Sequence, residues 1–567
     1  MPGGLLQLVA NGQANTILTG NPATTFFKAV YKHYTPFGLQ RFRLDYEGLR
    51  NLSFDSPTEF NFKVKRYAEM LQDTYIVINL PDIWSPLYDT SNCETYKYQW
   101  IKNVGFNMIK QITIYSGGSI LAQYSGEWMQ NAIDRDETEK KELVNRMTGN
   151  LPELFDPKSM HSSGNYPNAF TYTNNNKHIS PEPSIQGRKL YIPLMAWFCY
   201  STKTALPLIA LQYQEVNIKV EFRPVKELFT IATTKKEQEK QKGTKSQVPR
   251  VPIKMRKAPN SSDIEDQMWR FLQEPPLLPS EDLTSEDLTS EDLTKSYKNR
   301  RNDWNTDIHL IGTYIFLGDE ERRVMAAQEH HTLVKTQYEW DYLNTTGSSR
   351  VEIPSRDMIS SYMWRFRRSD VNERNEWSNY QNYELENTPP PIFPLTDISN
   401  NISSSVERLL KDCSNIYITR PRNISNKKNI MTDLAILCGQ DYRESTLDAG
   451  VYRYIEKWFR TSGTAKDGLY CYNFCTNTNR TTYQPTGAQN TNKWKYVTFE
   501  FNTIEPPKNT NSDQNSVDIL CDPSGAIIGV RKDVWKLNEY NFDLRIFEER
   551  YNMIEIVGGR IGLLCAR

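Results

Sequence analysis

The chain has 567 residues, and its 68 Lys and Arg balance its 68 Asp and Glu, so the formal net charge is zero. This balance excludes a global field that would attract nucleic acid or an acidic membrane, and it is compatible with self-association. One hydrophobic core serves about 250 to 300 residues. Because 32 Tyr, 30 Pro and 27 Gly also favour strands and turns, we expect two β-rich domains.

The first residues form a short apolar arm whose glycines disfavour a stable helix. They lack the basic start and the long apolar run of a signal peptide, and no window in the chain approaches about 18 apolar residues. We therefore expect a soluble protein made in the cytosol. Thr24–Tyr34 is rich in aromatic residues and lies between two prolines, which predicts the first core strand.

The first half then shows a series of strand patterns. Glu59–Val64 alternates as a half-exposed strand does, and the β-branched run Thr74–Leu80 is typical of a strand buried on both faces. Ile109–Tyr115 and Ile120–Tyr124 flank a pair of glycines, which predicts a hairpin. Glu127–Thr148 has apolar residues four apart among charges and predicts an amphipathic surface helix or a helix pair.

The stretch Leu190–Phe222 organises the first half. In its last part Val216, Ile218 and Val220 alternate with polar residues, as in a half-buried strand. Pro224 then ends the pattern because proline cannot donate to a β-ladder. We expect this stretch to close the first domain.

Composition changes over Lys226–Asn305. A lysine-rich polar run comes first, and Ser280–Thr294 is a threefold tandem repeat of SEDLT. A five-residue spacing fits neither a helix nor a strand, and the six carboxylates of the repeat would repel one another. We interpret the segment as a solvated, exposed insertion. A calcium site is disfavoured because the Gly and Asn spacing of a folded calcium loop is missing.

Strand patterns resume after the insertion. His309–Leu317 predicts a strand, and Gly318–Arg323 opens a short helix with acidic residues at its positive end. Further predicted strands, enough for a second sandwich, are Thr332–Trp340, Tyr362–Phe366, Leu434–Leu437, Val451–Phe459, Leu469–Phe474, Tyr496–Phe501, Val517–Cys521, Leu544–Phe547 and Tyr551–Val557.

The cysteines and histidines show no metal-binding pattern. Cys471 and Cys475 would share one face of a strand, but no second Cys or His pair flanks them, so we interpret them as packing residues rather than a zinc site. His330 and His331 lack the spacing of a zinc helix and would point to opposite faces of a strand. The eight cysteines are Cys93, Cys199, Cys413, Cys438, Cys471, Cys475, Cys521 and Cys565.

Charged residues that could do chemistry also have simpler interpretations. Asp134 and Asp136 are most simply the solvated face of a helix. Arg365, Arg367 and Arg368 alternate with aromatic residues and resemble a nucleic-acid stripe, but we expect an edge strand covered by arginine, with a self-assembly contact as the alternative. We find no nucleotide-binding or nucleophile motif, and so predict no catalytic, cofactor-binding or metal residues and no enzyme.

Four separated blocks of sequence resemble one family. They are Gly3–Phe37 (GGLLQLVANGQ, LTGNPATTFFK), Leu190–Phe222 (LYIPL, ALPLIALQY), Tyr314–Ala326 (YIFLGDEERRVMA), and the C-terminal pair Thr481–Asn490 (TTYQPTGAQN) and YNMIEIVGGRIGLLCAR. On these blocks the chain resembles the double jelly-roll major capsid proteins of large nucleocytoplasmic DNA viruses of eukaryotes. Two departures, at QPTGAQN and at Pro354–Tyr383, leave open whether it is the abundant shell subunit or a divergent paralogue.

The resemblance implies an all-β protein of two tandem eight-stranded jelly rolls with short helices and long loop insertions. We expect an N-terminal arm over residues 1–24, a first jelly roll over 25–223, the charged insertion over 224–305 and a second jelly roll over 306–567. Three copies would form a pseudo-hexagonal capsomer of an icosahedral virion shell assembled in the host cytoplasm. The arm would run along the inner, membrane-facing side.

The same resemblance implies partners but no cofactor. The chain would bind itself as a homotrimer and through capsomer contacts, together with minor or cement capsid proteins and inner membrane proteins, and would not bind nucleic acid directly. A different hypothesis is a tandem-sandwich module for carbohydrate or receptor binding. Its platforms would be the aromatic residues Trp84, Trp377 and Tyr380.

Overall fold

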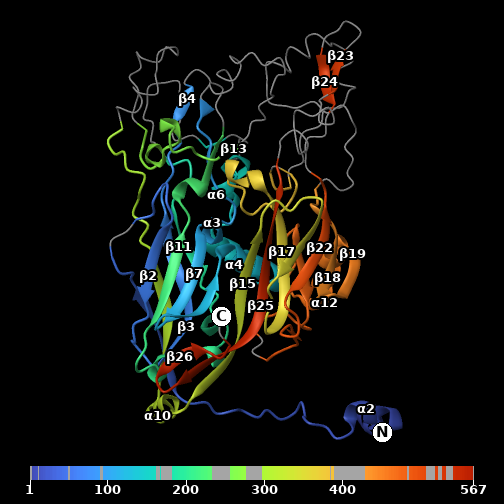
Figure 1. Cartoon of the computed structure of the whole chain (residues 1–567). Helices are drawn as coiled ribbons and strands as arrows, with labels where there is room; N and C mark the ends of the chain where they lie inside the picture. The colour runs from blue at the N-terminus through green and yellow to red at the C-terminus, as the bar shows by residue number, and fades with distance from the viewer. Residues whose placement is uncertain are drawn as a thin grey trace.

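The computed structural model describes most of the chain and confirms a mainly β-sheet protein. The described residues are 3–10, 12–48, 51–89, 94–160, 166–167, 182–232, 256–275, 297–383, 385–387, 428–481, 484–505, 518–521, 527–531 and 540–565. Figure 1 shows two β-barrels standing side by side, with β4, β13, β23 and β24 at one end and the N-terminal arm at the other.

The first barrel packs two antiparallel sheets around a large core. One sheet has the order β1-β14-β3-β10, with β9 paired to β3, and the other has the order β2-β11-β7-β8. Residues of β11 alternate between buried and half-buried, as the sequence predicts, because one face lies on the core. The strands are β1 (Phe37–Leu44), β2 (Thr58–Lys63), β3 (Met70–Leu80), β7 (Ile109–Ser116), β8 (Ser119–Tyr124), β9 (Arg188–Pro193), β10 (Leu206–Pro207), β11 (Val216–Phe222) and β14 (His309–Leu317).

The second barrel repeats this plan around a separate core. Its sheets have the orders β15-β25-β17-β20, joined by β21 and β26, and β16-β22-β18-β19. The strands are β15 (His330–Tyr342), β16 (Ser348–Ile353), β17 (Met358–Arg368), β18 (Met431–Cys438), β19 (Asp441–Asp448), β20 (Leu469–Asn473), β21 (Gln489–Asn490), β22 (Val497–Thr503), β25 (Phe542–Val557) and β26 (Arg560–Leu563). Because the sheets hold five and four strands in one barrel and six and four in the other, eight strands per jelly roll stays a prediction.

Short elements complete the described structure. The remaining strands are β4 (Leu87–Asp89), β5 (Glu94–Thr95), β6 (Tyr98–Trp100), β12 (Phe229–Ala232), β13 (Arg256–Lys257), β23 (Asp518–Cys521) and β24 (Ile527–Arg531). The α-helices are α1 (Gly3–Val9), α2 (Thr16–Thr19), α3 (Val104–Asn107), α4 (Gly126–Asp136), α5 (Lys141–Thr148), α6 (Pro152–Phe155), α7 (Pro157–Met160), α10 (Asp319–Ala327) and α12 (Glu456–Arg460). None of these helices is long and apolar enough to cross a membrane.

Several expectations about the first half are confirmed. The hairpin β7–β8 turns at Gly117 and Gly118, which both have positive φ. The short helix after His309–Leu317 is α10, with acidic residues in its first turn. Glu127–Thr148 forms the helix pair α4 and α5. The expectation of a surface position is wrong for α4, because all but one of its residues are buried between the barrels.

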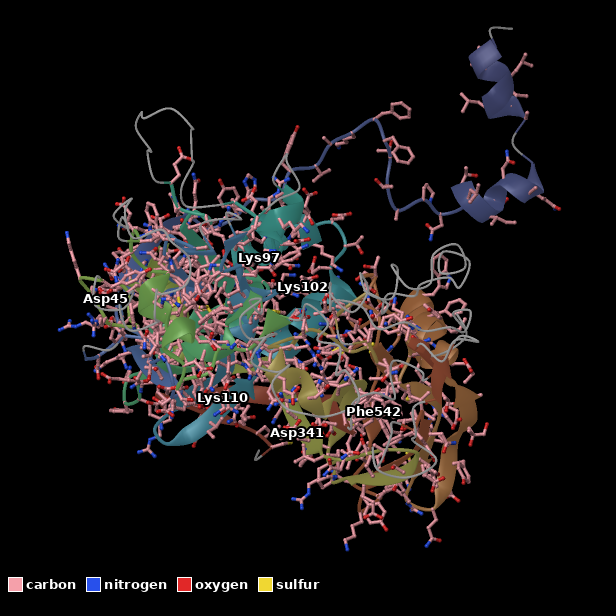
Figure 2. The ribbon with its side chains drawn as sticks, turned by 90° about the horizontal axis from the view of Figure 1, so that it is seen from above. Asp45, Lys97, Lys102, Lys110, Asp341 and Phe542 are labelled. Carbon is pink, nitrogen blue, oxygen red and sulfur yellow. The ribbon has the colours of Figure 1, made fainter. Side chains whose placement is uncertain are left out.

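The predicted first core strand at Thr24–Tyr34 is wrong. This segment has no regular strand, and Phe26 and Phe27 are 95% and 98% exposed. The first strand is β1, which follows directly, and two short helices precede the segment in place of the expected irregular arm. The aromatic residues of the arm have no core to enter, since they lie outside the barrel that they precede (Figure 2).

The strand after the insertion joins the opposite barrel from the expected one. His309–Leu317 forms β14, which lies between β1 and β3 in the first barrel and pairs with both. Tyr314 is fully buried there. The second domain, expected from residue 306, therefore gives its first strand to the first barrel, and its own sheets begin with β15.

The insertion is also less uniformly solvated than the sequence predicts. Phe229 and Ile231 of β12, and Met268 and Phe271 further on, are buried in the core of the first barrel. The SEDLT repeat at Ser280–Thr294 lies outside the described residues.

In the second half, two element assignments are wrong. The sequence predicts a strand over Val451–Phe459, but the segment forms a π-helical turn, η10 (Val451–Ile455), continued by α12. Its aromatic and β-branched composition favours strands, but the segment crosses from one sheet of the barrel to the other. The two strands expected within 544–557 form one continuous strand, β25.

Candidate assembly surfaces and the junction between the barrels

Helix α4 lies across the face of the second barrel and joins the two barrels. It begins at Ser125, whose side chain accepts a hydrogen bond from the Trp128 amide at 3.1 Å. The Ser125 amide in turn donates to Glu339 of β15 at 2.8 Å. Helix α4 directly follows β8 of the first barrel, so this capping already ties one barrel to the other.

A buried carboxylate near the start of α4 holds arginines of the second barrel. Glu127 accepts hydrogen bonds from Arg365 of β17 at 2.6 and 3.1 Å and from Arg545 of β25 at 3.0 Å. The Tyr380 hydroxyl donates to it at 3.0 Å. Burial opposes ionisation, yet Arg365, Arg367 and Arg545 together hold the pKa of Glu127 well below its usual range.

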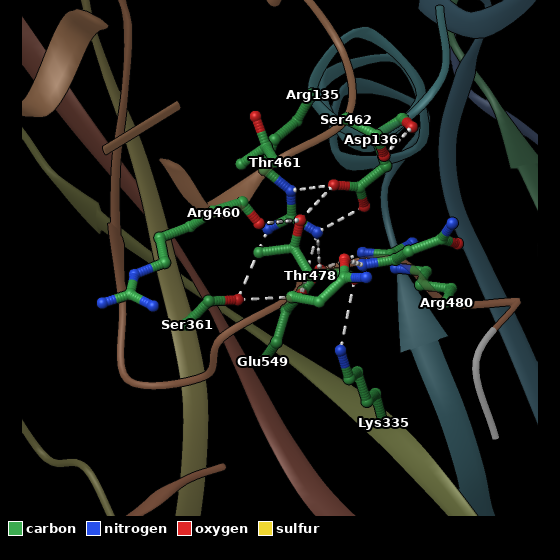
Figure 3. A network of polar contacts seen from close by, with 12 residues as sticks. Arg135, Asp136, Lys335, Ser361, Arg460, Thr461, Ser462, Thr478, Arg480 and Glu549 are labelled. Atoms are coloured by element: carbon green, nitrogen blue, oxygen red, sulfur yellow. Dashed lines mark hydrogen bonds and ion pairs between the residues drawn. The ribbon is translucent and has the colours of Figure 1, made fainter. Parts of the chain in front are cut away.

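A second ionic network lies at the end of α4 (Figure 3). Arg135 is fully buried and donates to Asp136 at 2.8 and 2.7 Å and to Glu549 of β25 at 3.2 Å. Glu549 also accepts from Ser361 of β17 at 2.9 Å and forms an ion pair with Arg480. Burial opposes ionisation of Glu549, but Arg135 and Arg480 hold its pKa far below its usual range.

Both networks fix the barrels to each other. Each charge is desolvated, and such groups are tolerated only when partners satisfy them. A bidentate contact between an arginine and a carboxylate fixes both the distance and the angle between the two groups, so the barrels can pack against each other in few other ways. The two barrels are therefore joined by buried ionic contacts and not by the connecting segments alone.

A small cavity lies at the same junction, between Tyr124 and Trp197 of the first barrel and Leu333 and Tyr551 of the second. Its volume of about 50 Å³ is sufficient for water rather than for a substrate. The junction therefore has a structural role.

The N-terminal arm presents apolar side chains that the rest of the described chain does not cover. The exposed fractions reach 86% at Ile17, 89% at Leu18 and 98% at Phe27. Apolar surface of this extent on a short segment marks contact with another molecule. The exposed large side chains of the arm are Leu5, Leu6, Leu8, Val9, Ile17, Leu18, Phe26, Phe27, Val30, Tyr31 and Tyr34.

The arginine stripe has a different role from the expected one. Strand β17 lies inside its sheet between β25 and β20, so the prediction of an edge strand is wrong. Arg365 is 2% exposed, and the alternating Trp364 and Phe366 fill the core on the other face of the strand. Arg368, at the end of the strand, is 4% exposed and forms an ion pair with Asp370 at 2.6 Å. An arginine on an interior strand needs a buried acid opposite it, and for Arg365 and Arg367 that acid is Glu127 of α4, a helix that the sequence pattern predicts at the surface.

The acidic pair of α4 is likewise not a solvated face. Asp136 is 7% exposed and accepts from the Thr478 hydroxyl at 2.6 Å as well as from Arg135. Asp134 forms an ion pair with Lys141 at 2.9 Å. The interpretation as a solvated face is wrong because this end of α4 packs against the second barrel, where Thr478 donates to Asp136.

The cysteines and histidines lie where packing residues would. Cys471 and Cys475 are free and buried. The His330 ring contacts the Met325 carbonyl oxygen at 2.8 Å, and His331 lies 3.3 Å from Glu555. Among the residues that the structure describes, no three His, Cys, Asp or Glu side chains gather in a way that could hold a metal ion.

The proposed sugar platforms are largely covered. Tyr380 is 2% exposed and bonded to Glu127, and the Trp377 indole donates to the Glu227 carbonyl at 2.9 Å and lies against Arg223 and Arg367. Neither ring offers the open face that stacking on a sugar requires, so the hypothesis of a carbohydrate module on these residues is wrong for both.

The first part of the chain is similar to known capsid protein sequences. Residues 25–262 match the family model described as the major capsid protein N-terminus. A probable capsid protein of Acanthamoeba polyphaga mimivirus is 32% identical over 237 residues, which are 41% of this chain and 40% of that protein. The major capsid protein of Phaeocystis pouchetii virus is 30% identical over 232 residues, which are 40% and 42% of the two chains. The chain thus spans about two fifths of the length of these relatives.

Comparison with solved structures extends over the whole chain. A subunit of the PBCV-1 virus capsid aligns with a TM-score of 0.58 at 15% identity, covering 96% of this chain and all of that one. The Faustovirus major capsid protein aligns with a TM-score of 0.55 at 11% identity, covering 96% and 94%. The fold is therefore that of the double jelly-roll capsid proteins. The family match includes the sequence block Leu190–Phe222 and most of the aromatic part of the first block.

Proposed function

We propose that this chain is the capsid protein of a large DNA virus, and that it assembles as trimers into the pseudo-hexagonal capsomers of an icosahedral shell. The observation that carries the proposal is the pair of jelly rolls fixed side by side by buried ion pairs, in a fold shared with the PBCV-1 virus capsid over 96% of the chain. Three such units present six barrels, which suits a hexagonal lattice.

The proposal includes the partners and the place of the protein. The chain would bind copies of itself within and between capsomers and would be located in the virion after assembly in the host cytoplasm. The apolar N-terminal arm would lie on the inner side of the shell, where minor capsid proteins and membrane proteins are its partners. The protein would act without catalysis or a cofactor, since its buried charges serve packing.

Native mass spectrometry of the purified full-length chain tests the proposal. We expect a particle of three chains of 66.0 kDa each, and hexagonal outlines by negative-stain electron microscopy. A chain that stays monomeric at every concentration tested would contradict it.

A further inference from the structure

One helix of the second barrel points its apolar side chains outward. Tyr454, Ile455, Trp458 and Phe459 are 58%, 50%, 81% and 70% exposed. They lie on one side of the helix, because residues four positions apart share a face, as Tyr454 and Trp458 do, and Ile455 and Phe459. We call these four residues the aromatic face.

The inner side of the same helix carries two buried cations next to the core residue Tyr452. Arg453 is 8% exposed, forms an ion pair with Asp467 at 2.6 Å and donates to Asn429 at 2.5 Å. Lys457 is 7% exposed, and burial lowers its pKa. A helix that meets only water shows the opposite arrangement, with apolar residues inside and charges outside. Four large apolar residues outside and two cations inside, with only Tyr452 in the core, therefore indicate that a further surface covers the aromatic face.

The position of the helix on the barrel indicates which neighbour could cover the aromatic face. The segment links β19 to β20, an end strand in each of the two sheets of the second barrel. It lies on the side of the barrel, away from the end with β4, β13, β23 and β24 and from the end with the arm (Figure 1). Subunits that stand next to one another in a shell meet through their sides.

We propose that the aromatic face binds a second copy of this chain, which rests on the proposed function. Its size fits such a contact. Three aromatic side chains of roughly 150–250 Å² each, more than half exposed, together with the isoleucine give on the order of 400 Å², about half of the ~800 Å² per partner in a standard interface. Because the net charge of the chain is zero, identical copies do not repel one another through their overall charge. Tyrosine and tryptophan are also the residue types that most often dominate binding energy.

The test compares the double variant Trp458→Ala, Phe459→Ala with the wild-type full chain by sedimentation velocity over a range of concentrations. We expect the concentration of half-association to rise by at least about tenfold, because truncating buried aromatic anchors removes most of their binding contribution. Trp458→Glu, which places a charge in the contact, should have at least the same effect. Leu343→Ala is the matched control, since Leu343 is 72% exposed in the same barrel but outside the aromatic face.

The thermal midpoint under dissociating conditions shows that the variants fold, and it should match the wild type because the removed side chains are exposed. If both aromatic-face variants associate as the wild type does, or if Leu343→Ala shifts association equally, the inference is overturned while the proposed function stands. A wild-type chain that never associates overturns both. Hexagonal wild-type particles that fall apart only in the aromatic-face variants would support both.

Discussion

Glu127 is the residue on which the junction between the barrels depends most. It is 5% exposed and faces Arg365, Arg367 and Arg545 at 2.6, 3.7 and 3.0 Å. In Glu127→Gln the Arg365 and Arg367 guanidinium groups would stay buried without this counter-charge, which typically costs about 3–5 kcal/mol, whereas Arg545 would keep its ion pair with Glu339 at 2.8 Å. We expect the free energy of unfolding to fall by that amount in urea denaturation.

The control for this variant is Glu142→Gln on α5. Glu142 and its partner Arg146 are 78% and 67% exposed, and such surface pairs contribute less than about 1 kcal/mol. Equal losses in the two variants would contradict a special role of the buried carboxylate.

Acid should weaken the fold through the same carboxylates. The pKa values of Glu127 and Glu549 are lowered in the folded chain, so between those values and the unfolded value of about 4.3 the unfolded chain binds more protons. Their stabilisation is therefore complete above about pH 5 and is lost as the pH falls further. Urea denaturation at a series of pH values should show this fall, and the variant Glu127→Gln, Glu549→Gln should show a shallower one.

At the residue scale, the sequence predicts the packing side of β17 but not the ionic side. Alternation of Trp364 and Phe366 with arginines reveals a strand with two different faces. It does not reveal whether the polar face meets water or buried acids. Glu127 and Glu549 lie 238 and 184 positions away from Arg365 in the sequence, and only the packing of α4 and β25 brings them close to β17. Periodicity in one segment carries no information about such a distant partner.

Among the elements, the loop after α12 closes the far end of the junction. The Gly463 amide donates to the Arg135 carbonyl at 2.7 Å, and a Cβ at Gly463 would overlap that carbonyl group. We expect Gly463→Ala to push the loop away from α4 and lower the free energy of unfolding by about 1–3 kcal/mol. Gly562→Ala is the control, because nothing lies within 4 Å of its Cβ position, and it should change stability by less than about 0.5 kcal/mol.

The SEDLT repeat should be dispensable for folding. Deleting Ser280–Thr294 removes a segment whose composition cannot form a core, while the flanking residues Met268 and Phe271 that enter the first barrel remain. We expect an unchanged thermal midpoint and an unchanged oligomer mass in native mass spectrometry. Loss of soluble oligomer on deletion would show that the repeat is structural.

The sequence predicts element type for strands whose core-facing side alternates clearly, although it misses β16, whose Val351 and Ile353 also enter a core. Val216–Phe222 is such a case, because burial there has the period of the pleat. The pattern failed where apolar residues point outward. Thr24–Tyr34 and Val451–Phe459 both contain many aromatic residues, which predicts core strands, yet apart from the buried Tyr452 their aromatic residues are exposed. A sequence pattern shows that apolar residues need cover, but it does not show whether the same chain provides it.

For the whole molecule, β14 makes the two halves of the chain inseparable. Its pairing with β1 and β3 fills the middle of a sheet in the first barrel, although about 80 residues of insertion precede it. A fragment ending at residue 305 would leave β1 without its neighbour and the core open at Leu310 and Tyr314. We expect residues 1–305 to be insoluble or unfolded by circular dichroism, whereas the full-length chain shows cooperative unfolding. A soluble, cooperatively folding fragment would contradict this.

The position of β14 in the sequence also determines when the first barrel can fold during translation. A ribosome adds roughly 5–20 residues per second, and domains generally fold as they emerge. Here the first barrel must wait until residue 317 has left the ribosome, so most of its strands emerge well before their sheet can close. During that interval the edges of β1 and β3 are open to other nascent chains. A cell that makes many copies at once would therefore need chaperones for this protein most at the midpoint of its translation.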